Sequence, residues 1–124
     1  MKKAFLMGAL LVAAAPAFAE TVLFDPGEGR QYVGEEFDAR SAKQVLYLDR
    51  PCQLPIVNAK DMREYTTTAI AIPMKACWGK LLGGEVVIVF ENGMTRRSSE
   101  SAYVVAEVDK KGNARIVKSI YKRR

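Results

Sequence analysis

The sequence predicts a small, mainly β protein with a minor helical part: an antiparallel curled sheet or partly open barrel with one short helix and one disulfide. Three observations support this class. Short runs of β-branched and aromatic residues alternate with turn residues along the chain. No internal repeat or linker divides the 124 residues. The two cysteines, Cys52 and Cys77, are enough for one bridge.

Residues 1–19 have the pattern of a cleavable signal peptide. Two lysines precede an apolar stretch over residues 4–15, and a small-residue cleavage site ends at Ala19. The stretch is shorter than the roughly 20 residues of a membrane-spanning helix. We therefore expect cleavage before Glu20, a single small β-rich domain over residues 20–124, no membrane span in the mature protein, and a periplasmic or secreted location, with a bacterial source.

Export decides how the cysteines are interpreted. In an oxidising compartment an even number of cysteines in a small domain indicates a structural bridge, here between Cys52 and Cys77. Closing a loop of about 25 residues stabilises a fold by roughly 3 to 4 kcal/mol in the chain-entropy model. A redox pair would show Cys-x-x-Cys spacing, which the sequence lacks. Trp78, beside the second cysteine, is expected in the core.

In the first half of the mature chain, β-forming residues predict strands at residues 21–24 and 44–50. A capping pair formed by Ser41 and Gln44 is the helical alternative for the second segment. Both segments are short, as is typical of strands in small sheets.

The segment inside the predicted disulfide loop contains the best short helix, over residues 58–65. Asn58 can cap this helix, and Asp61 lies in its first turn, near the positive end of the helix dipole. Residues 66–72 are again rich in β-branched side chains and predict a strand that leads toward Cys77.

The clearest strand covers residues 85–90, a nearly continuous apolar run. Asn92-Gly93 follows it and predicts a type I′ hairpin turn, with a return strand over residues 94–98.

A second hairpin is predicted from residues 102–108 and 114–121, with one face of its first strand in the core because its apolar residues alternate. The whole mature chain is thus expected to form five to seven short strands. The sequence does not distinguish a curled sheet from a closed barrel.

The sequence contains no recognisable catalytic constellation. It has no histidine, which removes the usual general base and the commonest metal ligand, and no phosphate-binding glycine motif. Paired carboxylates could still hydrolyse glycosides, but Glu35, Glu36, Glu85 and Glu91 are interpreted as surface acids. We therefore expect a protein that is not an enzyme and that uses no cofactor or metal.

The number and position of the basic residues favour a binding function instead. The chain has 19 basic and 14 acidic residues; without the two leader lysines 17 basic residues remain, a net charge of +3. Many basic residues come late in the chain, where guanidinium groups on a shared sheet surface could hold phosphate or carboxylate. The predicted binding residues are Arg96, Arg97, Arg115, Lys118, Lys122 and Arg123.

These observations favour an exported, non-enzymatic binding protein that acts on an anionic envelope component or another protein, with this basic sheet surface as the candidate binding surface. The sequence argues against nucleic acid, because no aromatic-rich DNA or RNA motif accompanies the charge. Two alternatives stay open at this point. One is a small carbohydrate-directed hydrolase that uses carboxylates, and the other is an accessory subunit of an envelope assembly.

Overall fold

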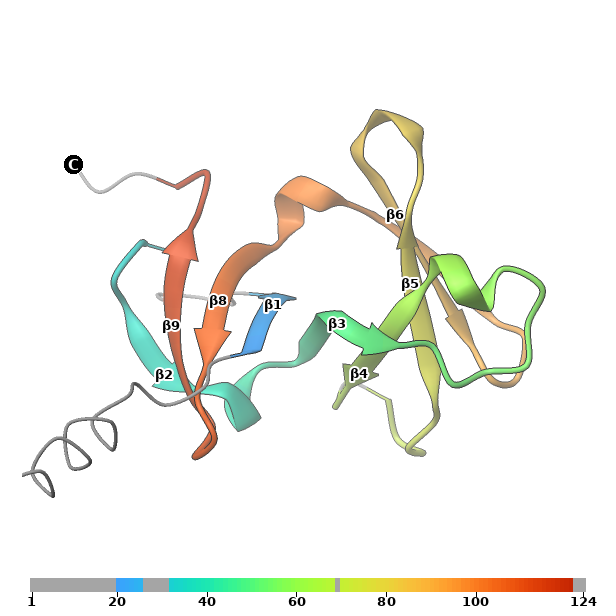
Figure 1. The fold of residues 1–124 in the computed structure, drawn as a ribbon, viewed down its shortest axis with the longest axis horizontal. Helices are drawn as coiled ribbons and strands as arrows, with labels where there is room; N and C mark the ends of the chain where they lie inside the picture. The colour runs from blue at the N-terminus through green and yellow to red at the C-terminus, as the bar shows by residue number, and fades with distance from the viewer. Residues whose placement is uncertain (1–19, 26–31, 69, 122–124) are drawn as a thin grey trace, which may run out of the picture.

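The computed structural model describes residues 20–25, 32–68 and 70–121. These residues form one antiparallel sheet of nine strands that curls without closing (Figure 1). The mainly β class and the single disulfide are confirmed, with more strands than the five to seven expected. The strands are β1 (Glu20–Phe24), β2 (Glu36–Asp38), β3 (Gln44–Pro51), β4 (Arg63–Thr67), β5 (Ala76–Lys80), β6 (Glu85–Phe90), β7 (Thr95–Ser99), β8 (Val104–Val108) and β9 (Asn113–Lys118).

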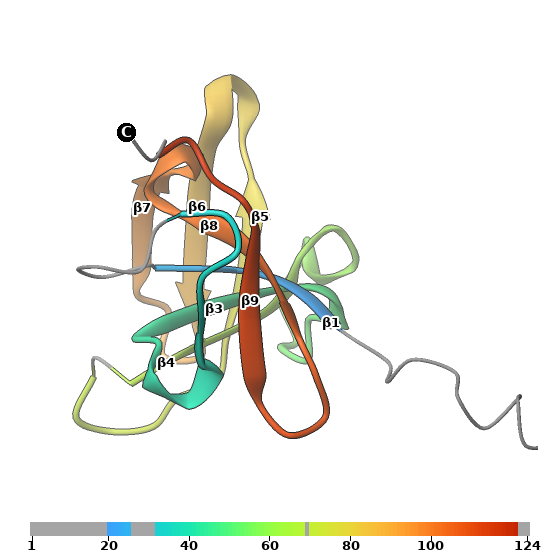
Figure 2. The ribbon, with the colours of Figure 1, turned by 90° about the vertical axis from the view of Figure 1, so that its left-hand side faces the viewer.

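The order of strands in the sheet is β2-β9-β8-β1-β3-β4-β5-β6-β7. The sheet coils strongly, so that β1 and β3 cross β9 at a steep angle (Figure 2). The described helices are four short 3-10 turns: η2 (Ala39–Ser41), η3 (Ala59–Asp61), η4 (Leu82–Gly84) and η5 (Glu100–Ala102). None of the helices in the described part of the chain has the length and hydropathy needed to cross a bilayer.

The sheet carries a core on each face, because its central strands bury both sets of alternating side chains. In β1, Leu23 packs into one core, whereas Val22 and Phe24 pack into the other. In β3, Leu46 joins the first core and Val45 packs against the second. The first core consists of Leu23, Leu46, Tyr65, Ala76, Trp78, Val86, Ile88, Phe90 and Tyr103. The second core consists of Val22, Phe24, Val104, Ala106, Ala114 and Ile116.

Several strand predictions are confirmed. The strands expected at residues 21–24, 44–50 and 85–90 are β1, β3 and β6, so the helical alternative for the second segment is wrong. Both predicted hairpins exist, as β6–β7 and β8–β9. One detail of the second hairpin is wrong: Val105, on the face of β8 opposite Val104, packs against the first core, so both faces of this strand contribute to burial.

The turn type predicted at Asn92-Gly93 is wrong. A type I′ turn needs positive φ at both residues, but among the described residues only glycines have positive φ, and here it is Gly93, at 91°. The N–H of Gly93 donates to the carbonyl of Phe90, and the N–H of Phe90 donates to the carbonyl of Met94, at 2.9 and 2.8 Å. The loop is therefore a three-residue turn that ends in a left-handed glycine.

The helix predicted over residues 58–65 is wrong. The segment forms only the 3-10 turn η3, and the Asn58 side chain makes no capping hydrogen bond. Tyr65 instead lies in β4, which pairs with β3 on one side and β5 on the other, and its side chain is 1% exposed. Strand pairing on both sides outweighs the weak helix propensity of so short a segment.

The strand predicted over residues 66–72 is wrong beyond Thr67, where β4 ends. Ile72 is 72% exposed, so its alternation with alanines does not mark a buried face. Pro73 follows Ile72 and removes a backbone donor from any ladder there.

The predicted bridge between Cys52 and Cys77 is confirmed. It ties the chain just after β3 to β5, and a small apolar cluster with Leu54 and Met62 surrounds it. Trp78 is 4% exposed and donates its Nε1 hydrogen to the carbonyl of Tyr47 at 2.9 Å, which confirms its place in the core. A structural disulfide indicates folding outside the reducing cytoplasm.

Candidate functional site

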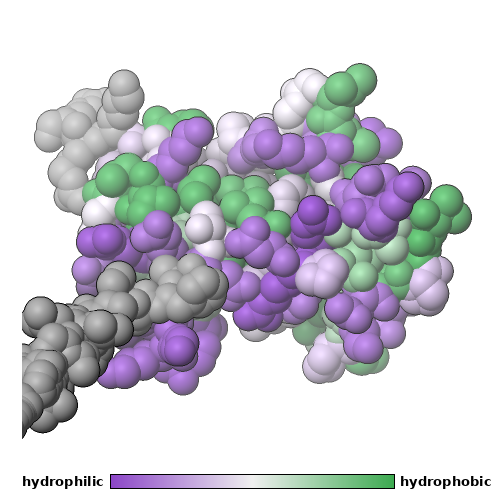
Figure 3. All heavy atoms as spheres, viewed as in Figure 1, coloured by the Kyte–Doolittle hydropathy of each residue, from purple (hydrophilic) through white to green (hydrophobic). Residues whose placement is uncertain are grey.

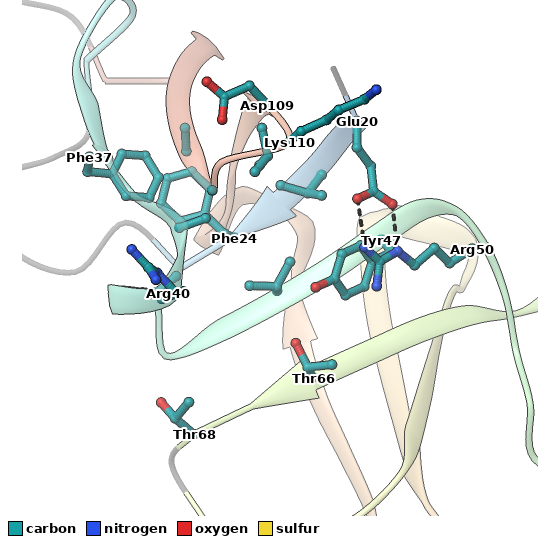
Figure 4. Close-up of a pocket in the computed structure, with 17 residues that line it drawn as sticks. Glu20, Phe24, Phe37, Arg40, Tyr47, Arg50, Thr66, Thr68, Asp109 and Lys110 are labelled. Carbon is teal, nitrogen blue, oxygen red and sulfur yellow. Dashed lines mark hydrogen bonds and ion pairs between the residues drawn. The ribbon is translucent and has the colours of Figure 1, made fainter. Parts of the chain in front are cut away.

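A pocket opens beside the second core, where the curled sheet does not close (Figure 4). Its volume is about 660 Å³, within the roughly 300–1,000 Å³ of small-molecule sites. Strands β1 to β4 and the β8–β9 turn supply its walls. The apolar floor is formed by Val22, Phe24, Phe37, Val45, Val108 and Ala114.

The floor is a continuation of the second core. The rings of Phe24 and Phe37 pack together with their centroids 4.4 Å apart. Phe24 is 2% exposed and belongs to the core, whereas Phe37 on the edge strand β2 is only partly buried. The second core therefore has an unfilled side that presents carbon atoms to the opening. Apolar surface of this kind favours ligands with an apolar body.

One wall of the pocket is an ion pair stacked on an aromatic ring. Nε and Nη2 of Arg50 donate to the two carboxylate oxygens of Glu20 at 2.7 and 2.9 Å (Figure 4). The Arg50 guanidinium lies 3.9 Å from the Tyr47 ring centroid, and Glu64 approaches it at 3.5 Å. The hydrogen bond to Glu20 is the main cause that raises the pKa of Arg50. The guanidinium is thus a fixed, permanently charged group.

The opposite wall contains a second pair, at the turn η2. Nε and Nη2 of Arg40 donate to the Asp38 carboxylate at 3.0 and 2.8 Å, and the backbone N–H of Arg40 donates to the same group at 2.9 Å. The side-chain hydrogen bond from Arg40, followed by the backbone one, lowers the pKa of Asp38. The pair is exposed to solvent, so it orients Arg40 more than it stabilises the fold.

The β8–β9 turn contributes Asp109 and Lys110 to the pocket. The Asp109 carboxylate accepts the backbone N–H groups of Lys111 and Asn113, both at 2.9 Å, and the bond from Asn113 is the largest cause that lowers the pKa of Asp109. Asp109 is therefore bound to its own turn. Lys110 forms no ion pair among the described residues, so its ammonium group is available at the rim.

A separate cluster of polar groups lies beside the first core. The Tyr65 hydroxyl donates to Oε1 of Gln44 at 2.8 Å, and the Tyr103 hydroxyl donates to the same oxygen at 3.4 Å. The hydroxyls of Tyr103 and Ser98 lie 2.7 Å apart. Burial raises the pKa of Tyr65. Because these groups satisfy one another and link β3, β4 and β7 to the chain before β8, their role is structural.

The basic residues predicted to bind do not form one surface in the described part of the chain. Arg96 and Arg97 are neighbours on β7 and point to opposite faces of the sheet. Nη1 of Arg97 lies 3.1 Å from the carboxylate of Glu85, and the guanidinium of Arg96 lies 5.9 Å from the Phe90 ring centroid. Their role in binding stays a prediction.

Two other predicted binding residues, Arg115 and Lys118, lie on β9, which six strands separate from β7 in the sheet order. Arg115 lies between two acids, with Glu36 as its partner on β2 and Glu107 as its partner on β8. Cross-strand neighbours are close enough for these charges to offset one another. Lys118 is exposed near the end of β9. Lys122 and Arg123 lie outside the described residues.

A second hollow, of about 460 Å³, lies where β9 ends. Lys118 and Ile120 form one side of it, and Gly83 and Gly84 of η4 form another. Hydrophobic side chains gather at this end of β9 (Figure 3), and Ile120 is 62% exposed. Serine side chains contribute much of the remaining wall. The pocket beside the second core is the better-formed site because its floor is continuous with buried apolar residues.

The carboxylates considered for hydrolysis make other contacts. Glu35 accepts the backbone N–H of Tyr32, and Glu91 accepts that of Lys75, both at 2.7 Å. Glu85 pairs with an arginine, as described above. Among the described residues no group of three or more acidic or cysteine side chains is placed to hold a metal ion.

Sequence reasoning did not identify the pocket residues as a site. Val22, Phe24 and Val45 were recognisable only as strand residues, and Arg50 and Lys110 only as charges. No local pattern shows which strands will leave a gap between them. The three consecutive apolar residues at the end of β1 were the available signal, but so short a run does not show that both faces of the strand are buried.

No protein-family model, no curated protein and no solved structure shows significant similarity to this chain. The pocket must therefore be interpreted from its own geometry.

Proposed function

We propose that this chain is an exported, non-enzymatic binding protein that holds the apolar part of a small molecule or envelope component in the pocket beside the second core. One observation carries the proposal: an apolar floor inside a hollow of about 660 Å³, with a charged rim whose arginines are already fixed by ion pairs. Apolar area supplies affinity, and fixed polar groups reduce the entropy lost on binding.

Export is supported by the leader-like residues 1–19 and by the disulfide. A periplasmic or secreted location in a bacterium fits both features. In that compartment the available ligands include lipids, cell-wall fragments and secreted small molecules, many of which combine an apolar part with an anionic group.

The non-enzymatic part of the proposal rests on the side chains around the pocket. Its two carboxylates, Glu20 and Asp109, are engaged by Arg50 and by backbone N–H groups. Glycoside hydrolysis requires an acid with a raised pKa, whereas the backbone hydrogen bonds lower the pKa of Asp109. The sequence has no histidine that could act as a base instead.

The test is binding of N-phenyl-1-naphthylamine, a neutral apolar probe whose fluorescence rises in apolar surroundings. Ala42 lines the pocket, so the larger side chain of Ala42→Trp fills part of the hollow. This substitution is expected to raise the dissociation constant of the probe about ten-fold or more, equivalent to about 1.4 kcal/mol. Ala102 is exposed at the end of η5, and Ala102→Trp is the matched control, which should bind as the wild type does.

Two outcomes would contradict the proposal. One is the absence of saturable probe binding to the folded wild-type protein. The other is equal binding by the wild type and both variants, which would place the probe outside the pocket.

A further inference from the structure

Glu20, the residue that follows the predicted cleavage site, lies at the rim of the pocket. Its backbone is the first residue of β1 and pairs with Val108 of β8. Its side chain is held by the two hydrogen bonds from Arg50. A terminus tied into a sheet in this way is ordered. Cleavage before Glu20 would therefore create a chain end whose position is fixed beside the pocket.

We propose that the α-amino group freed at Glu20 acts with Lys110 to bind the anionic group of an amphipathic ligand whose apolar body occupies the pocket. This inference rests on the proposed binding function and names its ligand class. The anionic group is a carboxylate, sulfonate or phosphate, which two ammonium groups can hold by charge-assisted hydrogen bonds. Maturation and ligand binding are coupled in this arrangement.

The charges at the rim leave room for an anion. Three basic residues (Arg40, Arg50 and Lys110) and two acidic ones (Glu20 and Asp109) line the pocket. The two arginines are paired with carboxylates, and the acidic groups are occupied by their own partners. Lys110 is thus the unpaired cation among these residues. A second cation near it would make this side of the rim positive.

Lys110 and Glu20 lie at the same side of the pocket. Lys110 comes two residues after Val108, the cross-strand partner of Glu20. Figure 4 shows its side chain extending from the β8–β9 turn toward Glu20. Both residues contribute to the lining of the hollow. The freed amine and the lysine ammonium therefore flank one part of the opening.

Cleavage changes the charge of the nitrogen at Glu20. Before cleavage this nitrogen is a neutral amide that is bonded to Ala19. Hydrolysis adds one water molecule, so Ala19 leaves with a carboxylate and Glu20 keeps an amine. An α-amino group has a pKa of about 7.7–8.0, so it takes up a proton and is mostly cationic at neutral pH. The precursor lacks this cation.

The experiment compares two probes with nearly the same rings: 8-anilinonaphthalene-1-sulfonate, which is anionic, and N-phenyl-1-naphthylamine, which is neutral. Three proteins are used: the mature chain that begins at Glu20, the same chain extended by residues 17–19, and the mature chain acetylated at its N-terminus. The sulfonate should bind the extended and acetylated proteins about five-fold more weakly, since one nearby charge is lost. The neutral probe should bind acetylated and mature proteins equally.

Lysine variants provide a matched control. Lys110→Gln should weaken sulfonate binding and leave the neutral probe unaffected. Lys111, its neighbour in the same turn, is exposed and does not line the pocket, so Lys111→Gln should change neither affinity. Thermal unfolding of each protein checks that the fold is kept.

The outcomes separate the two proposals. If the sulfonate binds the mature and acetylated proteins with equal affinity while Ala42→Trp still weakens binding of the neutral probe, this inference is wrong and the proposed function stands. If the neutral probe does not bind in the pocket, the proposed function is wrong and this inference with it. Mass spectrometry of the exported protein is a further check, because a mature chain that begins elsewhere would also overturn the inference.

Discussion

At the scale of single residues, the amide of Gln44 accepts hydrogen bonds from two tyrosines that the first core buries. Tyr65 is 1% exposed and Tyr103 is 6% exposed, and both hydroxyls donate to Oε1 of Gln44. Gln44→Leu would leave the Tyr65 hydroxyl without this acceptor. Because one intramolecular hydrogen bond contributes about 0.5–1.5 kcal/mol, urea unfolding should show a loss of stability of that size.

The control is a double-mutant cycle. Tyr65→Phe removes the hydroxyl, so adding it to Gln44→Leu should cost less than adding it to the wild type. Equal costs in the two backgrounds would mean that the hydrogen bond contributes nothing to stability.

Tyr65 also gives the protein a dependence on alkaline pH. Burial raises the pKa of this phenol above its ordinary value of 10.0, so the folded protein holds the proton more tightly than the unfolded chain does. The resulting stability is fully present below about pH 10 and is lost as the pH rises from there through the folded pKa. We expect the free energy of unfolding of Tyr65→Phe to fall less between about pH 9 and pH 11 than that of the wild type. Parallel pH profiles would contradict this.

At the scale of elements, the two hairpins depend on left-handed glycines in equivalent positions. Gly112 has φ of 91°, and its N–H donates to the carbonyl of Asp109 at 3.1 Å, as Gly93 does to Phe90. Gly112→Val should destabilise the protein by about 1–2 kcal/mol, because a β-branched residue is strained at positive φ. Gly112→Asn should cost less, because asparagine tolerates this region. Equal unfolding midpoints for the two variants would contradict the strain argument.

The hairpins also show what the sequence allowed us to predict. A strand run followed by Asn92-Gly93 is a local signal, and both hairpins were found from such signals. The failed predictions concern segments decided by distant partners. Tyr65 lies in a strand because β3 and β5 pair on both sides of it, and neither pairing can be read from residues 58–65 alone. Short segments with weak propensity follow their tertiary neighbours.

The candidate site was beyond sequence reasoning for the same reason. Glu20 and Arg50 meet across 30 positions of sequence, and the pocket is lined by residues from β1 to β4 and from the β8–β9 turn. Charge counting located basic residues on β7 and β9, but it could not show that Arg115 lies between two acids. A binding surface depends on strand order and register, which are global properties.

At the scale of the whole molecule, three strands join the two cores. β1 and β3 send alternate side chains into each core, and β8 does so through Val104 and Val105. Neither core can unfold without exposing apolar side chains of the other core. We therefore expect one cooperative transition, as is usual for a domain of this size.

A substitution in the second core tests this cooperativity with a reporter in the first. Ile116 is 1% exposed in the second core, and Trp78 is in the first. Ile116→Ala should cost about 2–5 kcal/mol and should lower the urea midpoint equally by Trp78 fluorescence and by far-ultraviolet circular dichroism. Ile88→Ala is the matched control, because it makes the same substitution in the first core, where the reporter Trp78 lies. A fluorescence midpoint that stayed at the wild-type value in Ile116→Ala would show that the two cores unfold separately.

Because the pocket is an open side of the second core, a probe bound there should raise both midpoints together, by the amount that its concentration and dissociation constant dictate.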